Sequence, residues 1–313
     1  MSPASRSNGS PEPNWALARK QPTLRERARI MQRIRAFFVD QGFLEVETPQ
    51  RIPANAPETH IVPVPSGDWC LHASPEVCMK RLLAAGFDKL FQICHCWRGE
   101  ERGKRHLPEF TLLEWYEAGA DYRTQMSDCE KLLCHLVPGK IVVYQGRKID
   151  LAPPWERIGV AEAFRRFASC SLAEALAADR FDEAMALEIE PHLGRDKPAF
   201  LCDYPIAKGA LARSKPADPG LVERFELYLL GMEVANGFSE LIDAEEQRRR
   251  FAQEEAARRA MGQTPYPLPE RFLAELPAMP ESAGIALGVD RLIMLLTDRA
   301  CIDEVVAFPP EML

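Results

Sequence analysis

Of the 313 residues, 46% are hydrophobic and 27% charged, an ordinary globular composition that excludes a fibrous repeat and wholesale disorder. Asp and Glu (46) outnumber Lys and Arg (39), and the net charge of −7 argues against stable binding of nucleic acid, because phosphate contacts require surplus cations. No apolar run reaches the roughly 20 residues of a membrane helix, and nine cysteines without a secretory leader indicate free thiols. We therefore expect a cytoplasmic protein without a membrane segment.

The first predicted elements are a tail and a long helix. Residues 1–15, rich in Ser, Pro and Asn, are expected to form a disordered tail. Thr23 and Glu26 have the spacing of a capping box, and apolar residues recur behind them at helical intervals as far as Gly42. Since no repeat or change of composition marks another boundary, we expect residues 16–313 to form a single domain.

The rest of the chain alternates irregularly between strands and helices. Strands are expected at residues 43–47, 89–98, 109–117, 199–204, 222–230, 233–242 and 285–287. Helices are expected at residues 75–85, 122–136, 159–167, 171–178, 181–190, 244–261 and from about 289 onward. This mixture predicts an α+β fold in which helices flank an antiparallel β-sheet.

The strand at 109–117 carries an unusual face. Period-two alternation places four of its side chains on one side: Phe110, Leu112, Glu114 and Tyr116. An ionised carboxylate is costly to bury unpaired, so we interpret this face as the floor of a pocket that binds a cation. A surface cluster of ion pairs around residues 97–101 fits the same charges equally well.

A second group of carboxylates is spaced by seven residues: Glu226, Glu233 and Glu240. A regular strand would alternate their faces, so they converge only if a turn or bulge intervenes, for example at Gly231 or Asn236. Converging carboxylates would attract Mg²⁺ or an ammonium group.

Cysteine and histidine residues give only a weak metal pattern. Cys94, His95 and Cys96 lie on a predicted strand, with Cys70 and His72 upstream. Neighbours on a strand point to opposite faces, so all of them cannot converge on one ion, and we expect buried free thiols.

The sequence contains neither a P-loop nor a dinucleotide-binding glycine motif nor a nucleophile elbow. Any phosphate would therefore be bound by arginines on a sheet.

Taken in order, four segments resemble the catalytic domain of class II lysyl-tRNA synthetases. Residues 43–49, 91–116 and 284–291 are similar to the three motifs of that class, and residues 231–241 are similar to its lysine-type pocket. The similarity extends over about residues 24–308. It implies the fold of a class II aminoacyl-tRNA synthetase catalytic domain, and its first motif, which contains an interfacial proline, implies a homodimer.

The resemblance implies a site for ATP. Arg98 would contact the α-phosphate and the substrate carboxylate, and Arg291 the γ-phosphate, as the two catalytic residues. Phe110 would stack on adenine, and Glu226 and Glu233 would hold Mg²⁺. The other residues implied around ATP are Gly99, Glu100, His106, Leu107, Val234 and Gly288.

The resemblance also implies a site for a dibasic amino acid. Glu76 would bind its α-amino group. Three residues would bind the distal ammonium: Glu114, Tyr116 and Glu240. The other residues implied around this substrate are Ser74, Pro75, Asn236 and Ala286.

The chain is most similar to the stand-alone paralogues of these synthetases, which lack the anticodon-binding barrel and attach (R)-β-lysine to a lysine of elongation factor P. Ala286 stands where lysyl-tRNA synthetases have glycine, and its methyl group is expected to favour a β-amino acid over α-lysine. Gly99 and Leu107 stand where asparagine is common in the family, and we expect them to loosen the packing of their loop.

The resemblance thus implies an ATP-dependent ligase that forms an aminoacyl-adenylate and passes the amino acid to the ε-amino group of elongation factor P. Three alternatives remain open: a truncated lysyl-tRNA synthetase that charges tRNA with lysine, an inactive module that senses lysine, and a ligase with a small amine as acceptor. An inactive module should have lost its phosphate-binding arginines or metal-binding carboxylates, and Arg98, Glu226 and Arg291 are present.

Overall fold

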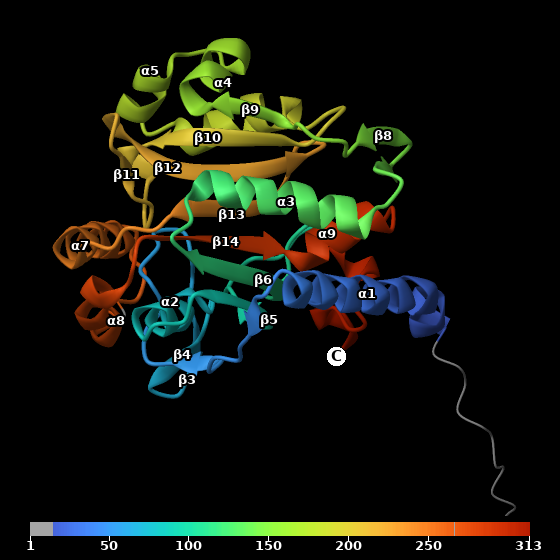
Figure 1. Cartoon of the computed structure of the whole chain (residues 1–313), viewed down its shortest axis with the longest axis horizontal. Helices are drawn as coiled ribbons and strands as arrows, with labels where there is room; N and C mark the ends of the chain where they lie inside the picture. The colour runs from blue at the N-terminus through green and yellow to red at the C-terminus, as the bar shows by residue number, and fades with distance from the viewer. Residues whose placement is uncertain (1–14, 266) are drawn as a thin grey trace, which may run out of the picture.

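The structure, a computed structural model, describes residues 15–265 and 267–313. A large mixed sheet forms its centre (Figure 1). In spatial order its strands are β1 (Leu44–Glu45), β5 (Lys89–Trp97), β6 (Glu109–Ala118), β14 (Ser282–Gly288), β13 (Met232–Ser239), β12 (Asp218–Leu229), β10 (Ala199–Pro205) and β9 (Glu156–Gly159), with β11 (Ser214–Lys215) paired to β12. The pairs β1–β5 and β9–β10 are parallel and the pairs between them antiparallel. The predicted α+β fold and the hairpin of β5 and β6 are confirmed.

Two small sheets and nine helices complete the described chain. The small sheets are β2 (Arg51–Ile52) with β4 (Trp69–Leu71) and β3 (Val64–Ser66), and β7 (Ile141–Tyr144) with β8 (Arg147–Asp150). The helices are α1 (Trp15–Asp40), α2 (Glu76–Ala84), α3 (Tyr122–Leu136), α4 (Val160–Phe167), α5 (Leu172–Ala177), α6 (Phe181–Ala184), α7 (Ala244–Ala260), α8 (Glu270–Glu275) and α9 (Val289–Leu296). The predicted helix at 181–190 is helical over its whole length, but only Phe181–Ala184 is α-helix; a π-helix at Met185–Ile189 and a 3-10 helix at Glu190–His192 follow. None of the described helices is long and apolar enough to cross a membrane.

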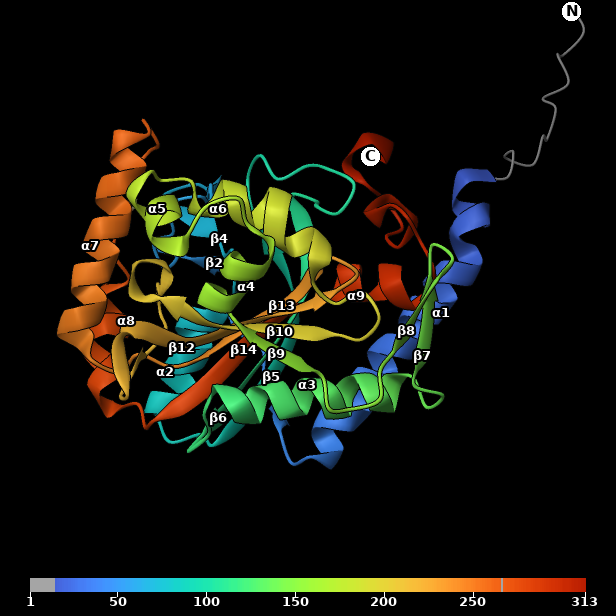
Figure 2. The same cartoon turned by 90° about the horizontal axis from the view of Figure 1, so that it is seen from above.

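The two faces of the large sheet differ. One face packs against α1, α3 and α9, where the main core contains large side chains such as Phe38, Leu133 and Trp115 (Figure 2). On the opposite face, α2, α7 and α8 cover one side and α4 to α6 the other. Strand alternation sends Trp115 into the core and its neighbours Glu114 and Tyr116 to this second face, as the sequence predicts.

The predicted start of the first helix is wrong. α1 begins at Trp15, continues through Pro22 and leaves Thr23 inside the helix. Thr23 is buried, and its hydroxyl accepts a hydrogen bond from Arg299 Nε (3.1 Å). The local capping signal therefore serves a tertiary contact. Apart from Trp15, the predicted tail lies outside the described residues.

A buried ion pair attaches α1 to the sheet. Arg27 Nη1 lies 2.5 Å from Asp290 Oδ1, and Arg27 Nη2 donates to Thr111 Oγ1 (2.9 Å). The other carboxylate oxygen of Asp290 accepts the backbone N–H of Thr111 (2.7 Å). Asp290, in the first turn of α9, thus joins α1, β6 and α9.

We expect Arg27→Ala to lower the free energy of unfolding by about 3 kcal/mol, because it leaves the buried Asp290 carboxylate without its ion pair. Arg29→Ala is the matched control on the same helix; its exposed pair with Glu26 is worth at most about 0.5 kcal/mol. Urea unfolding followed by circular dichroism measures both. Equal effects of the two substitutions would contradict the role of the buried pair.

Candidate active site

The second face of the sheet carries one row of polar side chains. Residues directly opposite each other on neighbouring strands share a face. From β12 to β5 the row consists of Glu226, Asn236, Ala286, Glu114 and Gln92. Five strands are thus aligned by register across one surface.

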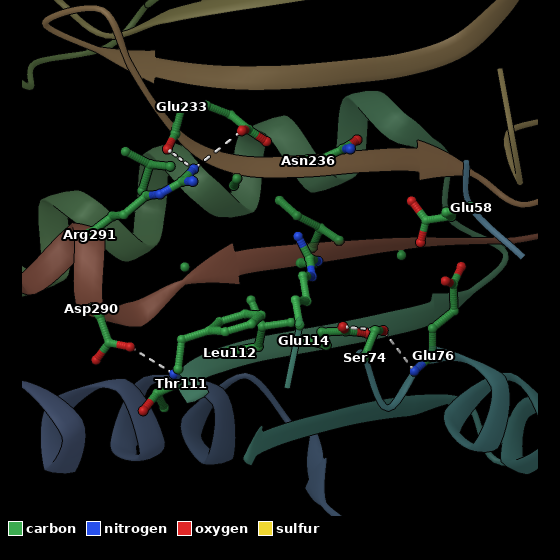
Figure 3. Close-up of a pocket in the computed structure, with 18 of the residues that line it drawn as sticks. Glu58, Ser74, Glu76, Thr111, Leu112, Glu114, Glu233, Asn236, Asp290 and Arg291 are labelled. Carbon is green, nitrogen blue, oxygen red and sulfur yellow. Dashed lines mark hydrogen bonds and ion pairs between the residues drawn. The ribbon is translucent and has the colours of Figure 1, made fainter. Parts of the chain in front are cut away.

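A pocket lies along this surface (Figure 3). Arg291 and Glu233 lie at one end of it. Glu58 and Glu76 lie at the other end, and Glu114 lies between the two. The pocket therefore has a basic end near the start of α9 and an acidic end near the start of α2.

Glu114 is held in place by two hydrogen bonds. Ser74 Oγ donates to Oε1 (2.6 Å) and Tyr116 Oη donates to Oε2 (2.8 Å). Burial, followed by the negative charge of Glu76, raises the pKa of Glu114 to about 8. The same Ser74 hydroxyl accepts the backbone N–H of Glu76 (3.0 Å), which ties this carboxylate to the first turn of α2.

Lys80 lies between two further carboxylates. Its Nζ is 2.5 Å from Glu76 Oε1 and 2.5 Å from Glu240 Oε2. Burial acts to lower the pKa of Lys80, but the attraction of Glu240 and Glu76 together outweighs burial and raises it, so the amine stays charged. In the described chain Glu240 Oε1 accepts no hydrogen bond. Gly284 permits this arrangement, because a Cβ there would overlap the Glu240 carboxylate and the Tyr116 ring.

The acidic end has an excess of negative groups. Burial raises the pKa of Glu240 to about 8, although Lys80 opposes the shift. Burial likewise raises the pKa of Glu58 to about 7, although Arg98 opposes it. Four carboxyl groups gather here: those of Glu58, Glu76, Glu114 and Glu240. One buried lysine cannot balance them, so this end attracts a cationic ligand, and a molecule with two ammonium groups best of all.

Arg98 lies beside an aromatic ring in the middle of the pocket. Its guanidinium carbon is 5.1 Å from the centre of the Phe110 ring. Its Nε is buried and has no hydrogen-bond partner among the residues described, and Nη1 is 3.8 Å from Glu101 Oε1, too far for a strong pair. The guanidinium is therefore available to an anionic ligand.

Arg291 is anchored at the basic end. Nη1 donates to the backbone carbonyl of Glu233 (2.9 Å) and lies 3.2 Å from its carboxylate, while Nη2 is 2.5 Å from His106 Nε2. Burial, and then the charge of Arg291, lowers the pKa of His106. The imidazole is therefore neutral, and Nε2 accepts the hydrogen bond with the proton assigned to Nδ1.

Three carboxyl groups approach each other next to this basic end. Glu226 accepts hydrogen bonds from Arg224 Nη2 (2.6 Å) and Tyr228 Oη (2.6 Å). Burial, and then the charges of Glu226 and Glu233, raises the pKa of Glu190 to about 7. Such mutual repulsion would be relieved by a cation, and carboxylate oxygens are the ligands that Mg²⁺ prefers.

The irregularity that the sequence requires between these carboxylates is present. Leu230 and Gly231, both with positive φ, make the turn from β12 to β13, and the register shifts where Val234 forms a bulge. The bulge turns Glu233 toward the same face as Glu226. Glu240 does not join them, because it lies at the acidic end with Lys80.

Most of the predicted site residues line the pocket: Ser74, Glu76, Arg98, His106, Leu107, Phe110, Glu114, Tyr116, Glu233, Val234, Asn236, Ala286, Gly288 and Arg291. Glu226 and Glu240 are buried behind its surface. Pro75 precedes α2 and does not line it, and neither do Gly99 and Glu100. Glu100 is exposed, with a φ of 64°.

The expected loosening of the loop after β5 is wrong. Leu107 is buried in the main core. The backbone N–H of Gly99 donates to the carbonyl of Val62 (2.7 Å), and a Cβ at Gly99 would lie 3.0 Å from Val62 Cγ1. The loop is therefore closely packed at both positions: Leu107 fills a place in the core, and Gly99 leaves room for Val62.

Sequence reasoning missed four charged residues of the site. Lys80 follows Glu76 by four residues, a helical spacing that could have indicated the pair. Arg224 alternates with Glu226 and Tyr228 along one strand face and could also have been found. Glu58 lies in an irregular segment and Glu190 at the start of a 3-10 helix, and neither carries a local signal for the site.

Comparison with known proteins agrees with this geometry. Residues 15–312 match the family described as tRNA synthetases class II (D, K and N). Proteins of Erwinia tasmaniensis and Klebsiella pneumoniae are each 38% identical to this chain, over 94% of it and 97% of their own length. A protein of Pectobacterium carotovorum is 39% identical over 95% of this chain and 98% of its own. All three are named elongation factor P–(R)-β-lysine ligase.

The family match covers nearly the whole chain, and its residues form one pocket with a basic and an acidic end on an antiparallel sheet. The chain belongs to the class II tRNA synthetase family of the D, K and N type.

Proposed function

We propose that this protein is an ATP-dependent ligase that activates (R)-β-lysine as an aminoacyl-adenylate and transfers it to the ε-amino group of a lysine on elongation factor P. The observation that carries the proposal is the pocket itself, which Arg98 lines and which has carboxylates suited to a diamine at one end and Arg291, suited to a triphosphate, at the other. The names of the relatives support the choice of amino acid and acceptor.

In the first step the carboxylate of the amino acid attacks the α-phosphorus of ATP, and pyrophosphate leaves. Arg98 is the residue that would offset the charge developing between the two reactants, because its guanidinium has no strong partner within residues 15–265 and 267–313. Phe110, against which Arg98 packs, would stack on adenine, and Arg291 would bind the γ-phosphate. The substrate carboxylate is already ionised, so this step needs no general base.

A bound Mg²⁺ would supply positive charge that offsets part of the phosphate charge. Glu226 and Glu233 would hold it, and Glu190 would add charge nearby. Among the other residues proposed around ATP, His106 would act through Arg291, to which it is hydrogen bonded. Gly99, Glu100, Leu107, Val234 and Gly288 complete this proposed set.

The acidic end would select the amino acid. Glu76 would bind the amino group near the reacting carboxylate, while Glu114, Tyr116 and Glu240 would bind the distal ammonium. Ala286 lies directly opposite Glu114 and Asn236 on neighbouring strands. Its methyl group would therefore limit how an amino acid lies over the sheet. Ser74 and Pro75 would position this end of α2.

In the second step the ε-amino group of the acceptor attacks the adenylate and AMP leaves. A lysine amine has a pKa of about 10.4, so it must lose a proton first. The alternative of a truncated lysyl-tRNA synthetase uses the same first step and differs only in the acceptor. The net charge of −7 and the relatives' names favour the protein acceptor.

We further propose that residues 16–313 form one catalytic domain and that it acts as a homodimer. Val39 and Leu44, at the end of α1 and in β1, are 58% and 50% exposed. Exposed apolar side chains in the segment that resembles the dimer-forming motif support this assembly.

Pyrophosphate exchange into ATP tests the function. We expect exchange with (R)-β-lysine at a higher kcat/KM than with (S)-β-lysine or α-lysine, followed by labelling of elongation factor P. Arg98→Ala should reduce exchange by a factor of about 10²–10³, because one donor to the developing charge is lost. Labelling of tRNA but not of elongation factor P would contradict the proposed acceptor.

Arg102→Ala is the matched control for this substitution. Arg102 lies in the same loop but pairs with Asp303 and Glu311, outside the pocket. Exchange should stay within about a factor of two of the unmodified enzyme. Full exchange by a folded Arg98→Ala protein would overturn the role assigned to Arg98.

Lys80→Met tests the balance of charge at the acidic end. Without the lysine, Glu76 and Glu240 lose the cation that pairs with both of them, so the KM for the amino acid should rise by at least about tenfold while the KM for ATP changes little. Lys131→Met, which removes a lysine paired on the surface of α3, is the control. Unchanged KM values for the amino acid in a folded Lys80→Met protein would argue against this role.

The raised pKa values predict how pH acts on the ligand-free protein. The pKa values of Glu114 and Glu240 rise from 4.5 to about 8, so the folded state binds protons that the unfolded chain releases, and stability falls as pH rises between these values. A diamine binds the ionised carboxylates, so the increase in Tm caused by β-lysine should be larger at pH 8 than at pH 6. Thermal unfolding with and without β-lysine measures it, and an equal increase at both pH values would contradict the assignment.

A further inference from the structure

Three metal-binding side chains meet at the end of β5, behind the pocket. Cys94 and Cys96 alternate onto the same strand face, while His95 points to the other face and pairs with Glu109 (3.0 Å). His72, just after β4, joins the two thiols. All three are buried, with exposures of 9% for Cys94, 0% for Cys96 and 1% for His72. Strand alternation thus removes His95 from the group but leaves a set of two cysteines and one histidine.

The spacing of these atoms fits a tetrahedral ion. The two sulfur atoms are 3.8 Å apart. Two thiolates bound to tetrahedral zinc at about 2.3 Å each would be separated by about 3.8 Å. Cys96 Sγ is 4.0 Å from His72 Nε2, and one ligand atom from each residue lies within 4.8 Å of the others. The three ligand atoms thus lie close enough together to converge on one ion after contraction of the group.

The histidine has a ring nitrogen to offer. His72 Nε2 is 2.8 Å from the carbonyl oxygen of His95, which accepts a hydrogen bond if the proton is on Nε2. Nε2 is also the ring nitrogen that lies 4.0 Å from Cys96 Sγ, so binding an ion through Nε2 would replace its contact with the carbonyl. Nδ1 would then carry the proton of the neutral imidazole.

A further oxygen is also available. Gln92 precedes Cys94 by two residues on the same face. Its Oε1 is buried and, within the part of the chain that the structure describes, accepts no hydrogen bond.

We propose that His72, Cys94 and Cys96 bind a zinc ion, with Gln92 Oε1 or a water molecule as the fourth ligand. Zinc would join β4 to β5 where the backbone N–H of Trp97 already donates to the carbonyl of His72 (3.0 Å). The two cysteines pack against Leu112 and Phe110, so the ion would stiffen the strand end that carries Arg98. The zinc site does not depend on the proposed ligase activity.

Metal analysis of the full chain, with any affinity tag removed, tests this proposal. We expect close to one zinc per chain after incubation with Zn²⁺ and dialysis, falling to less than about one tenth in Cys94→Ser and Cys96→Ser. Cys70→Ser is the matched control: this buried thiol lies two residues before His72 but exchanges hydrogen bonds with Asn55 and the carbonyl of Ile52. It should keep its zinc.

Spectroscopy on the unmodified chain gives a second measurement that requires no substitution. Co²⁺ in place of zinc should produce a thiolate-to-metal charge-transfer band in the near ultraviolet, and zinc should displace it. The proposal is overturned if the unmodified chain retains no zinc, if Cys70→Ser loses zinc as fully as Cys96→Ser, or if mass spectrometry of the freshly purified chain finds Cys94 and Cys96 joined in a disulfide.

Discussion

The pocket depends on holding several carboxylates away from water without neutralising all of them. Lys80 balances Glu76 and Glu240, while Ser74 and Tyr116 satisfy Glu114 by hydrogen bonds alone. Under the proposed function, this surplus of carboxyl groups over cations would be the source of selectivity, because a ligand with two ammonium groups supplies the cations that the protein does not. An amino acid with an uncharged side chain would leave these carboxyl groups buried without a compensating cation.

The sheet gives this arrangement its rigidity. Glu114 and Glu226 belong to strands distant in sequence, yet the register across β6, β14, β13 and β12 fixes their separation. The opposite face packs against α1, α3 and α9, and Asp290 joins two of these helices to β6. Core packing and the position of the charged groups are therefore two results of the same strand alternation.

Strand alternation and spacing carried most of what could be predicted from the sequence. They identified the shared face of Glu114 and Tyr116 and the need for an irregularity before Glu233, and the resemblance supplied the order of the motifs. The start of α1 could not be found locally, because Thr23 is used in a contact with Arg299, 276 residues away. Glu58 could not be predicted as a pocket residue for a similar reason: only the folded chain brings its loop to the pocket.

Val234 is an extra residue in β13, so the alternation of side chains between the two faces of the sheet is shifted by one residue from one side of the bulge to the other. Before the bulge, Glu233 pairs with Arg291 at the basic end of the pocket; beyond it, Asn236 lies opposite Glu226 and Ala286 on the neighbouring strands. The strand thus behaves as two half-strands whose alternation is set separately. Substitutions near the acidic end could therefore occur on one half of β13 without turning the side chains of the other half to the opposite face. New amino-acid preferences could arise in this scaffold while its nucleotide chemistry stays intact.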